Sequence, residues 1–174
     1  MDLVKKIFIL DTSAILSGKP IDFENKKIFT TNSISKELNP GGSDYRNFQY
    51  LIEKGLSILD PSKKSLEKIK KIAEKTGDIN RLSKADIEIL ALALDIKDNM
   101  EDEPVILTDD YSIQNVSAEI NIKFEPISQS GITKKFKWIC RCRGCGKKFK
   151  DNINICPICG AETKAVITSK KDIK

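Results

Sequence analysis

Four cysteines in two pairs constrain this chain more than any other sequence feature. Cys142-Arg-Gly-Cys145 and Cys156-Pro-Ile-Cys159 are C-x-x-C pairs separated by ten residues, and a glycine follows each pair. Thiolates at this spacing can surround Zn²⁺ tetrahedrally at about 2.3 Å, and glycine tolerates the backbone that turns toward the metal. We therefore predict one structural zinc ion bound by these four thiolates, with no coordination position open to water.

Two disulfides are the alternative for these cysteines. The apolar run Ile7–Leu10 is far shorter than a signal-peptide core or the roughly 20 residues of a membrane span. We therefore expect a cytoplasmic protein without a membrane partner, and a reducing compartment favours thiolates that bind metal. The fifth cysteine, Cys140, we interpret as a strand residue beside the zinc site.

Charge divides the chain in two. Residues 130–174 carry 12 Lys and Arg against 3 Asp and Glu, a net charge of +9, whereas residues 1–129 carry a net charge of −4.

The segment that contains the cysteine pairs is small. A module of about 30 residues cannot build a sufficient apolar core, so bound metal must supply much of its folding energy. We predict a linker over 128–135, a small β-type zinc ribbon over 136–165 and a basic tail over 166–174.

The cations of this basic end suit a polyanion partner. Trp138 and Phe149 lie among them, and such rings either stack on bases or form the small core of the ribbon. The residues predicted to bind nucleic acid are Lys134, Lys135, Lys137, Arg141, Arg143, Lys147, Lys148 and Lys150.

Apolar runs in the first 127 residues alternate with helical patterns. Ile7–Leu10 and Val105–Leu107 are continuous apolar runs, typical of strands buried on both faces. Weaker strands are predicted at 27–31, 56–59 and 122–124, and an acidic loop at 98–104. Helices are predicted at 62–75 and from Ser83 to Leu94, the second with one buried face, and shorter ones around 33–39 and 44–54. This alternation predicts an α/β domain with a parallel sheet.

Acidic residues follow both clear strands. Asp11 ends the first, and Asp109 and Asp110 end the second, where open parallel sheets bind ligands. Glu37 and Asp86 lie on helices that can face the same edge of the sheet, at the carboxyl ends of the strands, which we call the rim. Each has a structural alternative: Asp11 as a helix cap, Asp86 as part of a capping box with Ser83, and Glu37 as a solvated helix residue.

Converging carboxylates would need cations to offset their repulsion. The chain contains no histidine, so acid–base or metal chemistry must use other side chains. Carboxylates favour Mg²⁺ or Mn²⁺, and one or two such ions can activate a water and stabilise the attacking and leaving oxygens at a phosphodiester.

Four short segments carry a family resemblance. Ile9–Ala14, Ser35–Leu38, Leu82–Ile87 and Leu107–Tyr111 look like the acidic motifs of PIN-domain nucleases. With Gln114-Asn115-Val116 and the cysteine pairs, nearly the whole chain resembles the archaeal Nob-type (NIN-one-binding) endoribonucleases.

That resemblance implies a three-layer α/β/α PIN domain over residues 1–127, followed by the zinc ribbon. It also implies a divalent-metal-dependent endoribonuclease that cleaves single-stranded precursor rRNA and matures the 3′ end of small-subunit rRNA in the pre-small-subunit particle. By position, the family's catalytic residues fall on Asp11, Glu37, Asp86 and Asp110, with Asp109 in support, and Asp11, Asp86 and Asp110 would bind Mg²⁺ or Mn²⁺.

Two other functions stay open. One is a catalytically silent PIN-like RNA-binding assembly factor whose carboxylates serve structure. The other is a toxin-type PIN ribonuclease acting on tRNA or mRNA, against which the basic ribbon argues, because a free-standing toxin needs no docking module.

Overall fold

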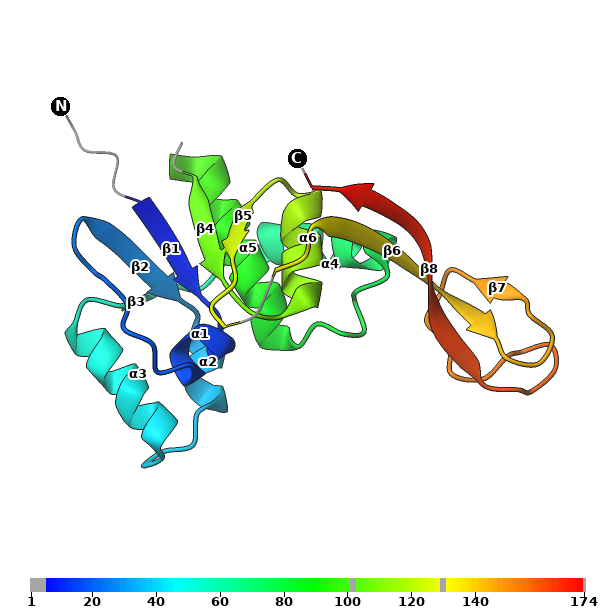
Figure 1. The fold of residues 1–174 in the computed structure, drawn as a ribbon, viewed down its shortest axis with the longest axis horizontal. Coiled ribbons are helices and arrows are strands. Elements are labelled where there is room, and N and C mark those ends of the chain that lie inside the picture. The colour runs from blue at the N-terminus through cyan, green and yellow to red at the C-terminus, as the bar shows by residue number, and fades with distance from the viewer. Residues whose placement is uncertain (1–5, 101–102, 129–130, 174) are drawn as a thin grey trace.

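A five-stranded parallel sheet forms the centre of the N-terminal part (Figure 1). The structure, a computed structural model, describes residues 6–100, 103–128 and 131–173. The strands of this sheet are β1 (Lys6–Leu10), β2 (Lys26–Thr30), β3 (Ser57–Ile58), β4 (Pro104–Leu107) and β5 (Lys123–Glu125). They lie in the order β3-β2-β1-β4-β5 with every pair parallel, which confirms the predicted α/β class.

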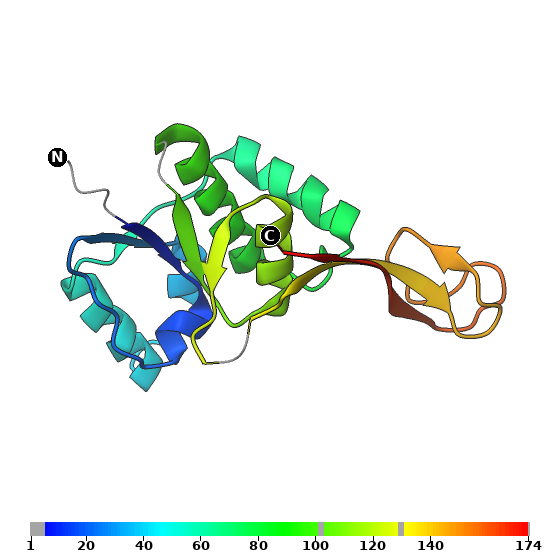
Figure 2. The same ribbon diagram turned by 45° about the horizontal axis from the view of Figure 1, so that its top comes forward.

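Helices cover both faces of the sheet and complete three layers, as Figure 2 shows. The helices are α1 (Thr12–Leu16), α2 (Asn32–Glu37), α3 (Ser43–Glu53), α4 (Lys63–Thr76), α5 (Lys84–Met100) and α6 (Tyr111–Glu119). α1 packs against α3, while α4 and α5 pack against each other. The part of the chain that the structure describes contains no helix long and apolar enough to cross a membrane.

The helix α5 is the centre of the core. We predicted one buried face, yet Ile89–Leu94 are buried without a break. The reason is that α5 contacts β1 and β4 of the sheet on one side and α2, α4 and α6 around it. The predicted acidic loop at 98–104 is shorter than expected, because α5 continues to Met100 and Pro104 begins β4; residues 101 and 102 lie outside the described residues.

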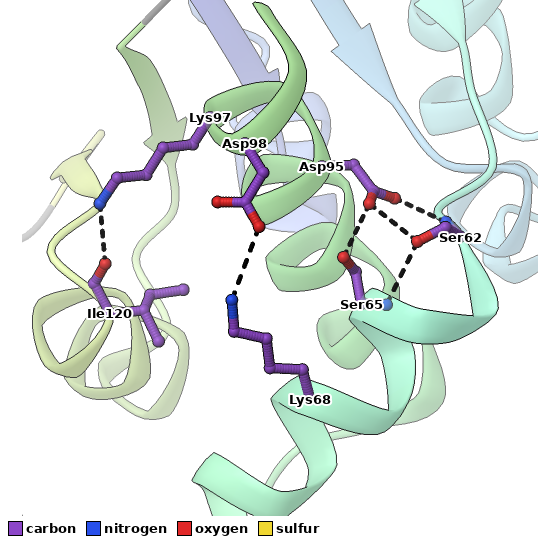
Figure 3. A network of polar contacts seen from close by, with 7 residues as sticks. All are labelled: Ser62, Ser65, Lys68, Asp95, Lys97, Asp98 and Ile120. Atoms are coloured by element: carbon purple, nitrogen blue, oxygen red, sulfur yellow. Dashed lines mark hydrogen bonds and ion pairs between the residues drawn. The ribbon is translucent and has the colours of Figure 1, made fainter. Parts of the chain in front are cut away.

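Polar side chains on α5 hold its neighbours in place (Figure 3). Asp95 accepts hydrogen bonds from the Ser62 backbone N–H at 2.6 Å, from the Ser62 hydroxyl at 2.8 Å and from the Ser65 hydroxyl at 2.7 Å, which fixes the start of α4. Lys97 donates to the Ile120 carbonyl at 3.0 Å, at the end of α6. These bonds fasten α4 and α6 to the central helix.

The C-terminal part is an antiparallel sheet that projects away from the body (Figure 1). Its strands are β6 (Lys134–Cys142), β7 (Lys148–Phe149) and β8 (Thr163–Asp172), in the order β7-β6-β8. Two details differ from the sequence prediction. Lys134 and Lys135 belong to β6 and not to a linker, and residues 166–172 are strand and not a tail, because β8 pairs with β6 as far as Asp172.

The parts of the predicted segments that fall at 1–5, 129–130 and 174 lie outside the described residues. The domain boundaries at 127 and 136 stay a prediction. What matters for the site is the strand order: the chain runs outward from β1 to β2 and β3, then returns to β4 beside β1. The carboxyl ends of β1 and β4 therefore form the switch point at which such sheets bind ligands.

Candidate active site and metal centre

Asp11 lies at this switch point, where β1 ends and α1 begins. Its side chain is 4% exposed and caps α1, with the Thr12 backbone N–H donating to Oδ1 at 2.6 Å. The hydroxyls of Ser13 and Thr108 donate to Oδ2 at 2.9 and 2.7 Å. The capping alternative is thus realised, and the same carboxylate also bridges the ends of β1 and β4.

Thr108 connects Asp11 to Asp110. Its hydroxyl donates to Asp11 and accepts from the Asp110 backbone N–H at 3.0 Å. Asp110 in turn caps α6, with its Oδ1 accepting from the backbone N–H groups of Ser112 and Ile113 at 2.6 and 3.3 Å. We did not single out Thr108 from the sequence; the available signal was a polar residue directly after a buried strand.

Asp86 and Glu37 approach the rim from helices. Asp86 forms the predicted capping box: the Ser83 backbone N–H donates to Asp86 Oδ2 at 2.6 Å, and the Asp86 N–H donates to the Ser83 hydroxyl at 3.2 Å. Glu37 is exposed at the end of α2, and its Oε2 accepts from the hydroxyl of Thr12 at 3.0 Å. Thr12, which follows Asp11 in the chain, therefore holds Glu37 at the rim through this hydrogen bond.

The electrostatics link three of these carboxylates. Burial raises the pKa of Asp11; hydrogen bonds from Thr108, Ser13 and Thr12 oppose the rise, and the negative charge of Asp86 adds to it. Burial also raises the pKa of Asp86, the hydrogen bonds from Ser83 oppose this, and the charge of Asp110 adds to it. Asp11, Asp86 and Asp110 thus share one electrostatic site, in which a positive ion is the natural compensation.

Asp109 has a different environment from its neighbour. Its carboxylate accepts from the backbone N–H of Ile127 at 2.7 Å, from the backbone N–H of Ser128 at 3.1 Å and from the Ser128 hydroxyl. These bonds fasten the segment after β5 to the loop after β4. They favour a structural role for Asp109 beside the rim.

The oxygen donors of the rim fit a hydrated divalent cation. Asp11, Asp86 and Asp110 do not form a tight cage: within the described ranges, the group whose ligand atoms all lie within 4.8 Å of one another is that of four cysteines. Mg²⁺ keeps several waters and needs only one or two carboxylates in direct contact. Hard oxygen donors and wider spacing therefore suit Mg²⁺ or Mn²⁺ better than Zn²⁺.

The cysteine cluster has the dimensions of a tetrahedral site. The Cys142 and Cys159 sulfurs lie 3.4 Å apart and those of Cys145 and Cys156 lie 3.7 Å apart. Four sulfurs about 2.3 Å from one central Zn²⁺ would lie about 3.8 Å from one another. The Gly144 N–H also donates to the Cys142 sulfur at 3.3 Å, as the knuckle turn requires.

The thiols also influence one another. The Lys147 backbone N–H lowers the pKa of Cys145, but desolvation and hydrogen bonds with the other three thiols outweigh it and raise the pKa to about 11. Four thiolates in so small a volume need a cation to offset their charge. Cys140 stands apart from the cluster: it is buried in β6 and its thiol donates to Asn152 Oδ1 at 3.0 Å, which confirms it as a strand residue.

The predicted nucleic-acid-binding cations divide into two groups. Lys134, Lys135 and Arg143 form ion pairs with Asp172 at 3.7 Å, Glu119 at 3.0 Å and Glu162 at 3.8 Å. The exposed residues Lys137, Arg141, Lys147, Lys148 and Lys150 carry the remaining charge on β6, β7 and the adjoining turns.

Comparison with known proteins decides the family. A family model described as the PIN domain of ribonuclease matches residues 8–96. The chain is 38% identical to Endoribonuclease Nob1 of Archaeoglobus fulgidus over 170 residues, an alignment that covers 97% of this chain and 95% of that protein. It belongs to the Nob1 family of PIN-domain endoribonucleases. Endoribonuclease Nob1 of Pyrococcus abyssi is 36% identical over 94% of this chain and 96% of its own length.

A differently named relative has nearly the same similarity to this Nob1-family chain. Ribonuclease VapC1 of Thermoplasma acidophilum is 35% identical over 170 residues, which cover 96% of this chain and 81% of that protein. The family model covers the first three acidic segments, and the alignment with the Archaeoglobus fulgidus protein, over 97% of this chain, extends across the four-cysteine cluster. The roles of individual rim residues stay a matter of proposal.

Proposed function

We propose that this protein is a divalent-metal-dependent endoribonuclease that cleaves single-stranded precursor rRNA and matures the 3′ end of small-subunit rRNA in the pre-small-subunit particle. The observation that carries the proposal is the position of Asp11 and Asp110 at the switch point of the sheet, where the Thr108 hydroxyl bonds to both, together with the charge of Asp86, which adds to the raised pKa of Asp11. Membership of the Nob1 family supports a metal-dependent nuclease with a role in rRNA maturation.

The residues divide the work as follows. Asp11, Asp86 and Asp110 hold one or two Mg²⁺ or Mn²⁺ ions, which when bound supply Lewis-acid activation of water and charge stabilisation at the phosphate. Thr108 and Ser13 hold the Asp11 carboxylate in orientation through their hydroxyl groups. Glu37, exposed at the rim beside Thr12, accepts a proton from or orients the attacking water.

The ribbon binds the RNA. Cys142, Cys145, Cys156 and Cys159 hold a structural Zn²⁺, and the exposed cations around them contact phosphates. Zinc-bound thiolates suit a reducing compartment, and we place the protein in the cytoplasm. The ribbon contributes affinity, and the carboxylate rim contributes cleavage.

Substitution of the rim separates cleavage from binding. Asp11→Asn and Asp86→Asn are expected to abolish cleavage of an RNA that spans the processing site, while RNA affinity is retained. Asp98→Asn is the matched control: Asp98 is exposed on the same helix as Asp86, about 18 Å further along. Undiminished cleavage by the rim variants would refute the assignment of these residues, whereas wild-type protein that binds the RNA without cleaving it would favour the silent assembly factor.

The ribbon is tested by salt dependence. Lys147→Ala with Lys148→Ala should weaken RNA binding and reduce the slope of log affinity against log salt by about 0.7 for each phosphate that the protein no longer neutralises. The control is Lys63→Ala with Lys64→Ala, an adjacent exposed pair on α4. Equal slopes in the two double variants would show that the basic ribbon face is only a solvated surface.

A toxin-type ribonuclease is the second candidate, because the relative named Ribonuclease VapC1 aligns over most of this chain. Competition between a precursor rRNA fragment and tRNA distinguishes the two functions. Preferential cleavage of tRNA would favour the toxin-type function.

A further inference from the structure

Two buried amides on α6, Gln114 and Asn115, lie where the ribbon meets the body. Gln114 is 0% exposed and Asn115 is 2% exposed. Neither side chain takes part in the rim or in the zinc site. Buried amides of this kind must be hydrogen-bonded, and their partners reveal what they hold together.

Gln114 connects the loop after β4, which begins at Thr108, to the segment that leads into β6 of the ribbon. Its Nε2 donates to the Thr108 carbonyl at 2.9 Å, and its Oε1 accepts from the Ile132 backbone N–H at 2.8 Å. Thr108 is the residue whose hydroxyl binds Asp11. One side chain therefore connects the backbone before β6 to the loop that orients the rim.

Asn115 clamps β6 itself. Its Oδ1 accepts from the Phe136 N–H at 2.5 Å, and its Nδ2 donates to the Phe136 carbonyl at 2.9 Å. The same Nδ2 donates to Oδ2 of Asp78 at 2.6 Å, and Asp78 is 1% exposed in the turn after α4. The amide thus bonds both backbone groups of one strand residue and ties them to a second element of the body.

Further contacts act on neighbouring residues of β6. Lys135 pairs with Glu119 of α6 at 3.0 Å. The guanidinium of Arg81 lies 3.8 Å from the centre of the Trp138 ring. The sequence left open whether this ring stacks on bases or forms the core of the ribbon; in the structure it packs on the body. Contacts at Ile132, just before β6, and at Lys135, Phe136 and Trp138 within it therefore fasten the first half of this strand to the body.

We infer that Gln114 and Asn115 form a joint that fixes the orientation of the ribbon relative to the acidic rim, so that RNA held by the ribbon presents one particular phosphate for cleavage. This inference rests on the proposed function and deepens it. Both are positioning residues, since they contact backbone groups and not the reacting atoms. The joint predicts that its loss affects where and how fast the RNA is cut, more than how tightly it binds.

The test uses the full-length, zinc-loaded chain with Asn115→Leu, and Asn99→Leu as an exposed control on α5. Residual dipolar couplings of backbone amides should fit one alignment tensor for body and ribbon in the wild type and two in Asn115→Leu. Cleavage at the main phosphate should fall about 10²-fold, with new cuts at neighbouring phosphates. RNA affinity and Mn²⁺ affinity should stay within about threefold of the wild type, since neither the rim nor the ribbon cations are changed.

A single shared tensor and an unchanged product pattern in Asn115→Leu would overturn the joint. If that variant loses its helical circular-dichroism signal, the surface double variant Arg81→Ala with Glu119→Gln decides, because it removes two restraints from an exposed and a half-buried residue. It should give a second tensor and about a tenfold loss of cleavage at the main phosphate. Wild-type protein that cuts no RNA would refute the proposed function, while the tensors would still test the joint.

Discussion

Replacement of Gly77 by alanine should destabilise the protein more than its backbone conformation alone explains. Gly77 ends α4 with φ +83°, a left-handed conformation that costs an alanine about 1–2 kcal/mol. In addition, a Cβ at this position would lie 2.4 Å from the Trp138 carbonyl oxygen and 2.8 Å from the Trp138 Cβ. Relief of such an overlap in a packed contact costs about 1–3 kcal/mol, so the total is about 2–5 kcal/mol.

Gly18 offers a matched control. It also has a positive φ, +62°, but nothing lies within 4 Å of a Cβ built there, so Gly18→Ala should cost only the conformational part, about 1–2 kcal/mol. Urea unfolding followed by far-ultraviolet circular dichroism gives both free energies of unfolding.

A second signal follows the contact itself. Trp138 is the single tryptophan of the chain, so its fluorescence reports on this contact without labelling. In Gly77→Ala the ring should move away from Arg81 and its emission should shift to the red. Equal destabilisation in the two variants, with unchanged tryptophan emission, would refute the close approach of β6 to the end of α4.

Three further predictions concern charge and metal. Burial raises the pKa values of Asp11 and Asp86 above 3.8, so the native state binds protons more tightly than the unfolded chain, and stability without divalent ions should fall as pH rises above about 4. Asp11→Asn or added Mn²⁺ should flatten the plot of urea midpoint against pH. Identical slopes of this plot with and without either change would contradict the prediction. Chelation of zinc should disorder the ribbon and leave the helical signal intact, because all helices of the described part lie in residues 12–119; a simultaneous loss of helix would count against it. Asp109→Ala should cost about 1–3 kcal/mol of stability, because the backbone N–H groups of Ile127 and Ser128 lose their acceptor. Cleavage should fall less than tenfold. A loss of cleavage as large as that of Asp11→Asn would instead show that Asp109 takes part in catalysis.

Local signals in the sequence were enough to predict several elements of this fold. The apolar runs that became β1 and β4 are buried on one face, and their apolar residues on the other face are at least half-buried. The ends of α4 fall at Ser62 and Gly77 because a hydroxyl cap and a left-handed glycine act within one turn. The cysteine cluster was predictable for the same reason, since metal geometry dictates ligand spacing.

Elements that depend on tertiary contacts were harder to predict. We did not single out α6, whose buried face includes Gln114, Asn115 and Ser117 and so lacks an apolar period. Gln114 and Asn115 are buried because distant segments supply their hydrogen-bond partners, and the sequence does not show which segments those are. The burial of α5 on all sides likewise depends on how many neighbours surround it. The position of Asp109 next to Asp110 predicted a shared role, but the two side chains point to different partners.

The length of β6 sets a minimum size for RNAs that can use the ribbon. The nine residues from Lys134 to Cys142 extend about 26 Å, and the strand leaves the body at its first half, where Asn115 holds Phe136. An oligonucleotide that reaches the rim but ends before the two cysteine turns, Cys142–Cys145 and Cys156–Cys159, gains no affinity from the cations beside them. Cleavage efficiency plotted against substrate length should consequently rise in a step and not gradually, and the position of that step would measure the distance between the two ends of the bound RNA.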